Sequence, residues 1–147
     1  DFGLARLSND AGLTRTGDLL GTLRYMSPEQ TQGKPTAVDH RTDVYSLAAI
    51  LYRATTGHPA FSGKDVPSTL YDVVYRIPTQ PSILASLPGD VDRVLAIGLA
   101  KNPADRFATA LDLSQWFALA IDNALTPDQR RRGDDVIARY PWGTRPQ

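Results

Sequence analysis

The stretch DVYSLAAILYRATT, residues 43–56, decides the fold. Its apolar residues lie nearly all round a helix of about 3.6 residues per turn, a pattern typical of a helix that is buried on most of its sides. Gly57 follows as a stop signal, and Pro59 prevents the helix from resuming. The sequence therefore predicts a buried helix over residues 43–56.

Shorter patterns on both sides of this helix predict further helices. They are a short helix from Pro28 that stops at Gly33, an amphipathic helix over residues 64–76, a helix that Asp90 could cap, a helix opened by Thr109, and a last helix start at Thr126. Residues 4–27 are polar and rich in glycine, so we expect a long loop there, with at most a short strand at residues 4–7. From Arg130 onward we expect a frayed helix that runs into a linker, with Arg130–Arg132 as a solvated face.

Composition excludes several classes of function. Lysine and arginine number 16, as do aspartate and glutamate, so there is no overall positive field to hold a nucleic acid or an anionic membrane. The absence of cysteine excludes disulfides, thiolate zinc sites and cysteine nucleophiles, and two histidines are too few for a histidine-built metal site. No apolar run approaches the roughly twenty residues of a membrane helix, and no signal peptide opens the chain.

Four motifs follow one another along the chain. They are Asp-Phe-Gly at 1–3, Gly-Thr-Leu-Arg-Tyr-Met-Ser-Pro-Glu at 21–29, Asp-Val-Tyr-Ser-Leu at 43–47 and Lys-Asn-Pro-Ala-Asp-Arg-Phe at 101–107. In this order they resemble the second half of a eukaryotic-type protein kinase, from the metal-binding aspartate through the activation segment to the end of the C-lobe. Residues 38–47 particularly resemble bacterial (Hanks-type) serine/threonine kinases. The resemblance covers residues 1–122 and implies a mainly α fold, a truncated kinase C-lobe in which about five helices follow a long activation loop.

The first three residues take their implied roles from the nucleotide site of that family. Asp1 matches the carboxylate that holds Mg²⁺ against the phosphates of ATP, and a carboxylate oxygen is a hard ligand suited to Mg²⁺. Phe2 matches the residue whose packing separates active from inactive states, and Gly3 matches the hinge beside it. The cofactors implied for the complete kinase domain are therefore ATP and Mg²⁺.

The loop that follows carries the implied regulatory and substrate residues. Thr14 and Thr16 resemble the activation-loop phosphosites of bacterial kinases, since a phosphate can order a loop against arginines. The alternative is a pair of solvated loop threonines. Gly21 and Thr22 match the floor of the substrate-peptide pocket in serine/threonine kinases, and Tyr25 either lines that pocket or packs beneath it.

Three charged residues have implied structural roles. Glu29 and Arg106 match a pair that ties the activation segment to the helical core, and the alternative is two exposed charges. Asp43 matches the aspartate that accepts backbone N–H bonds from the catalytic loop, and it could also be a plain N-cap. One departure concerns Ala48, which stands where the family usually has glycine, so its methyl group must fit a close contact.

The resemblance implies that the chain is part of a bacterial signalling kinase, a transferase that moves the γ-phosphoryl of ATP to serine and threonine hydroxyls of protein substrates. In the family, the glycine-rich loop, the strand lysine and the catalytic loop all precede the Asp-Phe-Gly motif. We therefore expect no catalytic base in this chain, no activity of the chain alone, and a need for an N-lobe and catalytic loop as partners. A pseudokinase scaffold and a free-standing helical interaction module remain as alternatives.

These expectations divide the chain into three parts. They are an activation segment at residues 1–29, a helical core at 30–122, and a C-terminal helix and linker tail at 123–147. The implied location is cytoplasmic, and whether the parent protein is anchored in a membrane stays open.

Overall fold

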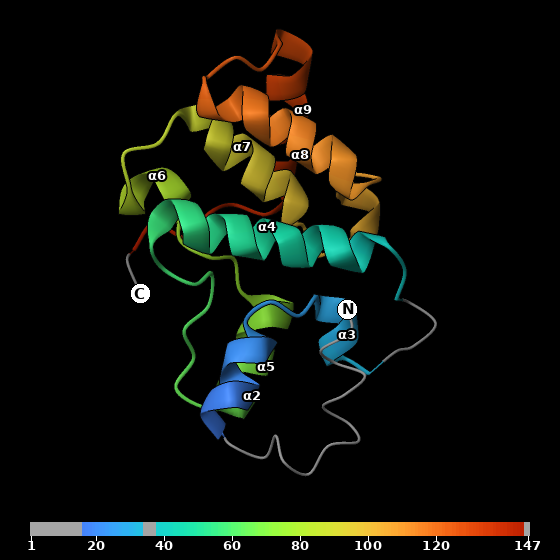
Figure 1. The fold of residues 1–147 in the computed structure, drawn as a ribbon, viewed down its shortest axis with the longest axis vertical. Helices are drawn as coiled ribbons and strands as arrows, with labels where there is room; N and C mark the ends of the chain where they lie inside the picture. Colours follow the sequence, from blue (N-terminus) through green and yellow to red (C-terminus); the bar gives the residue numbers. More distant parts are fainter. Residues whose placement is uncertain (1–15, 34–37, 146–147) are drawn as a thin grey trace.

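The computed structural model describes residues 16–33 and 38–145, and the regular elements within these ranges are helices (Figure 1). The elements are α2 (Thr16–Leu23), α3 (Pro28–Thr31), α4 (Arg41–Thr56), α5 (Val66–Tyr75), α6 (Pro81–Leu84), α7 (Gly89–Gly98), the 3-10 helix η3 (Pro103–Asp105), α8 (Ala110–Ile121) and α9 (Pro127–Arg139). Within the described ranges there is no strand, and an isolated bridge joins Thr79 to Gly143. The expectation of a mainly α fold is confirmed.

Helix α4 is the centre of the molecule. It crosses the middle of the view in Figure 1, with α7 and α8 on one side and α2, α3 and α5 on the other. Its buried residues include Val44, Tyr45, Ala49 and Tyr52, each at most 1% exposed. The helix ends as predicted at Gly57, whose φ of 76° is left-handed and whose N–H donates to the carbonyl of Arg53.

Helices α4 and α7 meet at two small residues. Ala48 is fully buried, and a Cβ placed on Gly98 would lie 2.6 Å from the Cβ of Ala48. Because no real Cβ atoms approach so closely, Gly98 must lack a side chain for α7 to pack this near to α4. The close contact expected for the Ala48 methyl group is therefore with Gly98.

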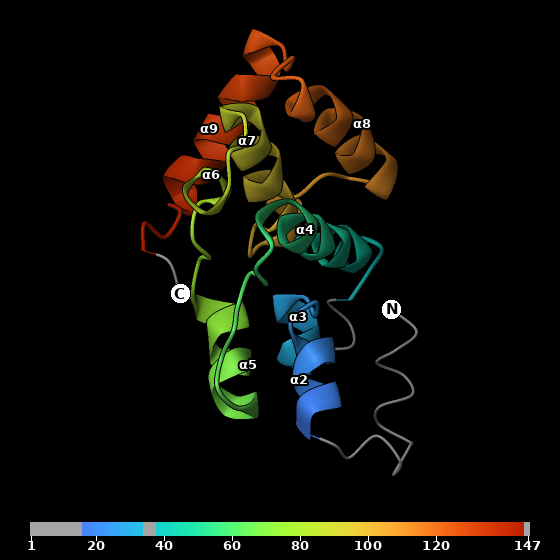
Figure 2. The same ribbon diagram turned by 60° about the vertical axis from the view of Figure 1, so that its left-hand side comes forward.

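The expectation of a loop over residues 4–27 is wrong for Thr16–Leu23, which form α2. Leu19, Leu20 and Leu23 fall on one face of this helix, and Leu23 is 5% exposed. Figure 2 shows α2 beside α5, against which it packs. Burial of Leu23 and partial burial of Leu19 and Leu20 outweigh the glycine content that favours a loop. The strand expected at residues 4–7 lies outside the described residues.

Some of the expected helix caps are present and others are not. Thr109 and Thr126 cap α8 and α9, and the Gln129 side chain completes a capping box with Thr126. Asp90, however, does not cap α7, because Pro88 occupies the N-cap position. The Asp90 carboxylate is fully buried and instead accepts hydrogen bonds from Arg93, Arg130 and the backbone N–H of Leu125. The Asp90 carboxylate, which the local sequence pattern predicts to cap the helix, thus binds residues that lie far along the chain as well as Arg93.

The frayed helix and linker expected from residue 130 onward are also wrong. Helix α9 packs along α7, where a Cβ on Gly133 would lie 2.5 Å from the Cβ of Arg93, and Val136 is buried. Arg130 pairs with Asp90 at 2.9 Å, so it does not belong to a solvated face. Arg131 does, because it is exposed and its ion pair among the described residues is with Asp128, one helical turn away.

The segment after α9 also belongs to the core. Trp142 is 9% exposed, and its ring lies 6.4 Å from that of Tyr52. The N–H of Gly143 donates to the carbonyl of Pro78 at 2.8 Å, and the N–H of Gln80 donates to the carbonyl of Gly143 at 2.8 Å. These bonds attach the C-terminal segment to the connection between α5 and α6.

Candidate functional site

The predicted site residues fall into two groups. Asp1, Phe2, Gly3 and Thr14 lie outside the described residues, so their roles stay predictions. The others are placed: Thr16, Gly21 and Thr22 in α2, Tyr25 after it, Glu29 in α3, Asp43 in α4, and Arg106 directly after η3.

Helix α3 fixes the position of Glu29. Its N-cap is Ser27, whose hydroxyl accepts from the N–H of Gln30 at 3.3 Å, while the Gln30 side chain accepts from the N–H of Ser27 at 3.0 Å. This capping box, with Pro28 at the first helical position, sets the start of a single helical turn. The turn directs the Glu29 side chain into the interior, where Glu29 is 5% exposed.

The structure brings Glu29 and Arg106 together across 77 positions of sequence. Nη1 of Arg106 donates to Oε2 of Glu29 at 2.7 Å, and Nη2 donates to Oε1 at 2.8 Å. The Arg106 side chain is 0% exposed and that of Glu29 is 6% exposed. A planar guanidinium that meets a carboxylate through two parallel bonds is the strongest geometry of such a pair. The arrangement is the buried pair, not the two exposed charges of the alternative.

The other donors of Arg106 tie the pair to the helical core. Its Nε donates to the carbonyl of Ala100 at 2.8 Å, and Nη1 and Nη2 donate to the carbonyls of Arg41 at 3.1 Å and Lys101 at 3.2 Å. The guanidinium also lies 5.0 Å from the centre of the Tyr45 ring. All five N–H donors are thereby used. One side chain connects α3, the start of α4 and the segment after α7.

The carboxylate of Glu29 is held in its charged form. Burial by itself would raise the pKa of Glu29, but the hydrogen bonds and charge of Arg106, with a hydrogen bond from Thr42, hold that pKa below its usual value of 4.5. The Thr42 hydroxyl donates to Oε2 of Glu29 at 2.9 Å, and Thr42 is itself buried. Sequence reasoning missed Thr42, and nothing in its local pattern marks it.

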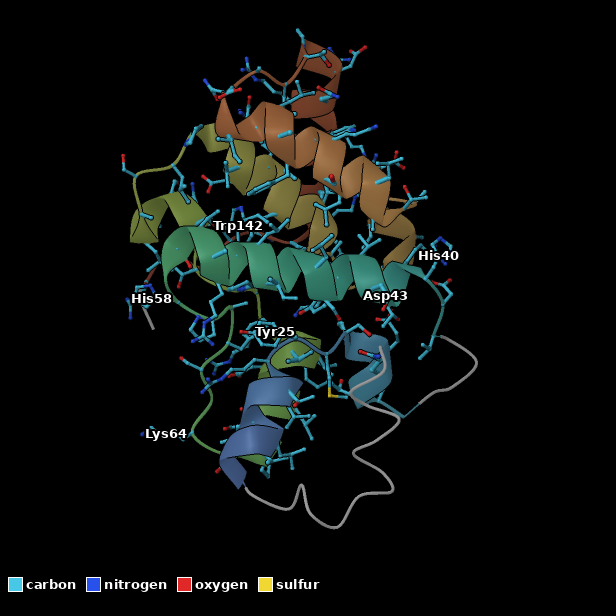
Figure 3. All side chains as sticks on the ribbon, viewed as in Figure 1. Tyr25, His40, Asp43, His58, Lys64 and Trp142 are labelled. Carbon is cyan, nitrogen blue, oxygen red and sulfur yellow. The ribbon has the colours of Figure 1, made fainter. Side chains whose placement is uncertain are left out.

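The chain before α3 is attached to α4 through Tyr25. The Ser46 hydroxyl donates to the carbonyl of Tyr25 at 2.6 Å, and Nη1 of Arg53 donates to the Tyr25 hydroxyl at 3.1 Å. Figure 3 shows Tyr25 between α4 and α2. Gly21 and Thr22 lie in helical backbone here, so the loop expected for a substrate-pocket floor is replaced by the last turns of α2.

Asp43 lies in the first turn of α4, at the end of the helix where Figure 3 also labels His40. The N-cap residue is His40, so the simple N-cap interpretation of Asp43 is wrong. Asp39 takes over a capping function, since its carboxylate accepts from the N–H of Arg41 at 2.8 Å. Asp43 is exposed, and its predicted role toward a catalytic loop stays a prediction.

Lys101 is a second residue that sequence reasoning missed. Its Nζ donates to the carbonyl of Val73 at 2.6 Å and lies 4.8 Å from the centre of the Phe61 ring. Burial lowers the pKa of Lys101 to about 7, and the nearby charge of Arg106 acts in the same direction. The motif Lys-Asn-Pro-Ala-Asp-Arg-Phe thus supplies two cations with different partners. Arg106 pairs with Glu29, and Lys101 donates to the carbonyl of Val73.

Two kinds of site are absent from the part of the chain that the structure describes. Its histidine, aspartate and glutamate side chains form no group of three that could hold a metal ion. Among the described helices, none has the length and apolar character required to cross a membrane.

Comparison with known proteins identifies the family to which the chain belongs. The family model for the protein kinase domain matches residues 1–133, so the chain belongs to the protein kinase domain family. The match continues past residue 122 into α9, beyond the expected end of the resemblance.

Bacterial relatives share much of the sequence. The chain is 38% identical over 141 residues to the serine/threonine-protein kinase PknD of Mycobacterium tuberculosis, covering 95% of this chain and 20% of that protein. It is 43% identical over 116 residues to PknB of the same species, covering 77% of this chain and 18% of that protein. It is 40% identical over 133 residues to a probable PknB of Corynebacterium glutamicum. The resemblance to bacterial serine/threonine kinases is confirmed, and the chain spans about a fifth of the length of these relatives.

Proposed function

We propose that this chain is part of a serine/threonine protein kinase that transfers the γ-phosphoryl of ATP to hydroxyl groups of protein substrates. The observation that carries the proposal is the buried, bidentate contact between Glu29 and Arg106. It attaches the end of the proposed activation segment to the helical core. The order of motifs and the bacterial kinases among the relatives support the same function.

The proposed chemistry assigns a role to each end of the segment. Asp1 would hold Mg²⁺ against the ATP phosphates, since a carboxylate is the oxygen ligand that Mg²⁺ prefers, with Phe2 and Gly3 controlling its position. Thr14 and Thr16 would accept activating phosphate, and Gly21, Thr22 and Tyr25 would face the substrate peptide. Phosphoryl transfer depends on positioning and on stabilisation of charge. A fixed end at Glu29 therefore helps to position the residues of the activation segment that precede it.

The proposed organisation is an activation segment at residues 1–29 and a helical core that follows it. Because α9 and the segment after it pack on that core, we place residues 123–145 with the core as well. The proposed location of the kinase domain is the cytoplasm.

The second candidate is a pseudokinase, a scaffold with the same fold and no transfer activity. The retained Asp1 and Gly3 favour the enzyme, because a scaffold does not need the metal-binding carboxylate or its hinge. The residues that precede Asp1 in the full-length protein discriminate between the two. The enzyme requires a His-Arg-Asp-like motif, an asparagine five residues beyond its aspartate, and a strand lysine. Absence of the aspartate and the lysine would favour the scaffold.

A further inference from the structure

The backbone of Arg106 is held by a residue of helix α9. Nη2 of Arg132 donates to the carbonyl oxygen of Arg106 at 3.1 Å. The guanidinium of Arg132 also lies 5.1 Å from the centre of the Phe107 ring and 5.2 Å from that of Trp116. A cation over two aromatic faces and a hydrogen bond to a carbonyl both favour one position of this side chain.

The end of α9 holds the residues just before Arg106. Nη1 of Arg139 contacts Oδ1 of Asp105, and the Tyr140 hydroxyl donates to Oδ2 of Asp105 at 2.8 Å. The same hydroxyl accepts from the N–H of Asn102 at 3.4 Å. Together with Arg132, these residues contact Asn102, Asp105, Arg106 and Phe107 from a single helix and the residue that follows it.

The segment that bears Arg106 has little regular structure to fix it. Its helix η3 spans only Pro103–Asp105, and the backbone of Arg106 is extended, with φ of −81° and ψ of 170°. A short 3-10 turn has poor hydrogen-bond geometry and gains its rigidity from its surroundings. In this structure, much of those surroundings is α9.

We propose that α9 is a positioning helix for the Glu29–Arg106 ion pair, and that Arg132, Arg139 and Tyr140 are its positioning residues. Their hydrogen bonds go to residues 102, 105 and 106 and not to Glu29 or the Arg106 guanidinium, so they act by fixing the backbone from which Arg106 reaches α3. Loss of these contacts to residues 102–107 therefore loosens α3 through Arg106. Since α3 ends the proposed activation segment, any effect of α9 on kinase activity rests on the proposed function, whereas the link from α9 to α3 does not.

Hydrogen exchange in the full-length protein tests this inference. The reporters are the backbone N–H groups of Thr31 and Gln32, which donate to the carbonyls of Ser27 and Pro28 within α3. In the double variant Arg132→Ala/Tyr140→Phe, their exchange should become about tenfold faster, because one or two hydrogen bonds of ordinary strength are lost from the support of Arg106. Replacing Arg132→Ala by Arg132→Lys in the double variant keeps a cation and a hydrogen-bond donor at this position. Thr31 and Gln32 should then exchange more slowly than in the double variant that carries alanine.

Two variants on the same helix serve as controls. Arg131→Ala removes an exposed arginine whose ion pair, among the described residues, is with Asp128, and Arg130→Ala removes the ion pair with Asp90 near the start of α9. Both should leave exchange of Thr31 and Gln32 within about twofold of the wild-type rate. If Arg130→Ala accelerates α3 as much as the double variant does, or if the double variant has no effect on α3, the inference is wrong. Exchange does not require phosphoryl transfer, so the result is independent of whether the protein is an active kinase.

Discussion

The Glu29–Arg106 ion pair allows a prediction of stability that can be worked out from its contacts. The perturbations are Glu29→Gln and Arg106→Met, singly and together, in the complete kinase domain. Both side chains lie in the interior, at 6% and 0% exposure. Loss of one partner from such a pair leaves the other charge without compensation, which costs about 3–5 kcal/mol of the free energy of unfolding.

The two single variants should differ in size. Glu29→Gln keeps an acceptor for Arg106 and for the Thr42 hydroxyl, so we expect the lower end, about 3 kcal/mol. Arg106→Met leaves Glu29 charged and removes the donor to the carbonyls of Ala100, Arg41 and Lys101, so we expect the upper end, about 5 kcal/mol. The double variant should cost less than the sum of the two by about 2 kcal/mol, because the second change removes a charge already left unpaired.

Urea denaturation followed by tryptophan fluorescence measures these differences. Trp116 is a suitable probe because its ring contacts Phe107 edge-on, with 5.1 Å between ring centres, next to Arg106. The pH dependence supplies a second measurement. Since the pKa of Glu29 is lowered in the folded state, its contribution is complete above its usual pKa of 4.5 and is lost as pH falls below that value. Glu29→Gln should not show this loss. Additive effects that total less than about 0.5 kcal/mol would refute the account of a buried, coupled pair.

Three further predictions follow from other parts of the structure. Gly98→Ala should destabilise the kinase domain by about 1–3 kcal/mol in the same denaturation assay. Ala48→Gly should recover most of that loss, because it vacates the space that the new methyl group needs; absence of recovery would show that this contact is not the cause. Because burial lowers the pKa of Lys101 from 10.5 to about 7, the free energy of unfolding should rise as pH increases from about 7 to 10.5. Lys101→Met should flatten that rise, and an unchanged slope would contradict the lowered pKa of Lys101. In the full-length protein, Thr16→Ala should lower kinase activity tenfold or more, with Thr14 as a secondary site, and phosphopeptide mapping of the active protein that finds neither threonine modified would contradict this role.

The sequence predicts well those parts of the fold that depend on residues close together in the chain. The apolar residues of 43–56 and the stop at Gly57 place α4 to within two residues at its start and identify its end. Capping residues such as Thr109 and Thr126 likewise act within one helical turn. These features need no knowledge of the rest of the chain.

The errors arise where a distant partner decides the outcome. Asp90 satisfies the local rules for a cap, but Arg130, 40 positions later, takes its carboxylate. The three arginines of α9 look alike in sequence. Arg131 and Arg132 are both exposed as predicted, but Arg130 contacts Asp90 on α7 and Arg132 contacts the carbonyl of Arg106, and neither distant partner can be read from the local pattern. The pairing of Glu29 with Arg106 spans 77 positions and was predictable through the family resemblance, which local pattern could not replace.

The most direct test of the proposed function is phosphoryl transfer by the full-length protein. With γ-labelled ATP, Mg²⁺ and a generic basic protein, we expect label on serine and threonine of the substrate and on the protein itself. Asp1→Asn should abolish this label, since it removes the carboxylate that would hold the metal ion, and the 147-residue chain alone should transfer none. Absence of label from the full-length protein, or transfer that persists in Asp1→Asn or in the chain alone, would contradict the account.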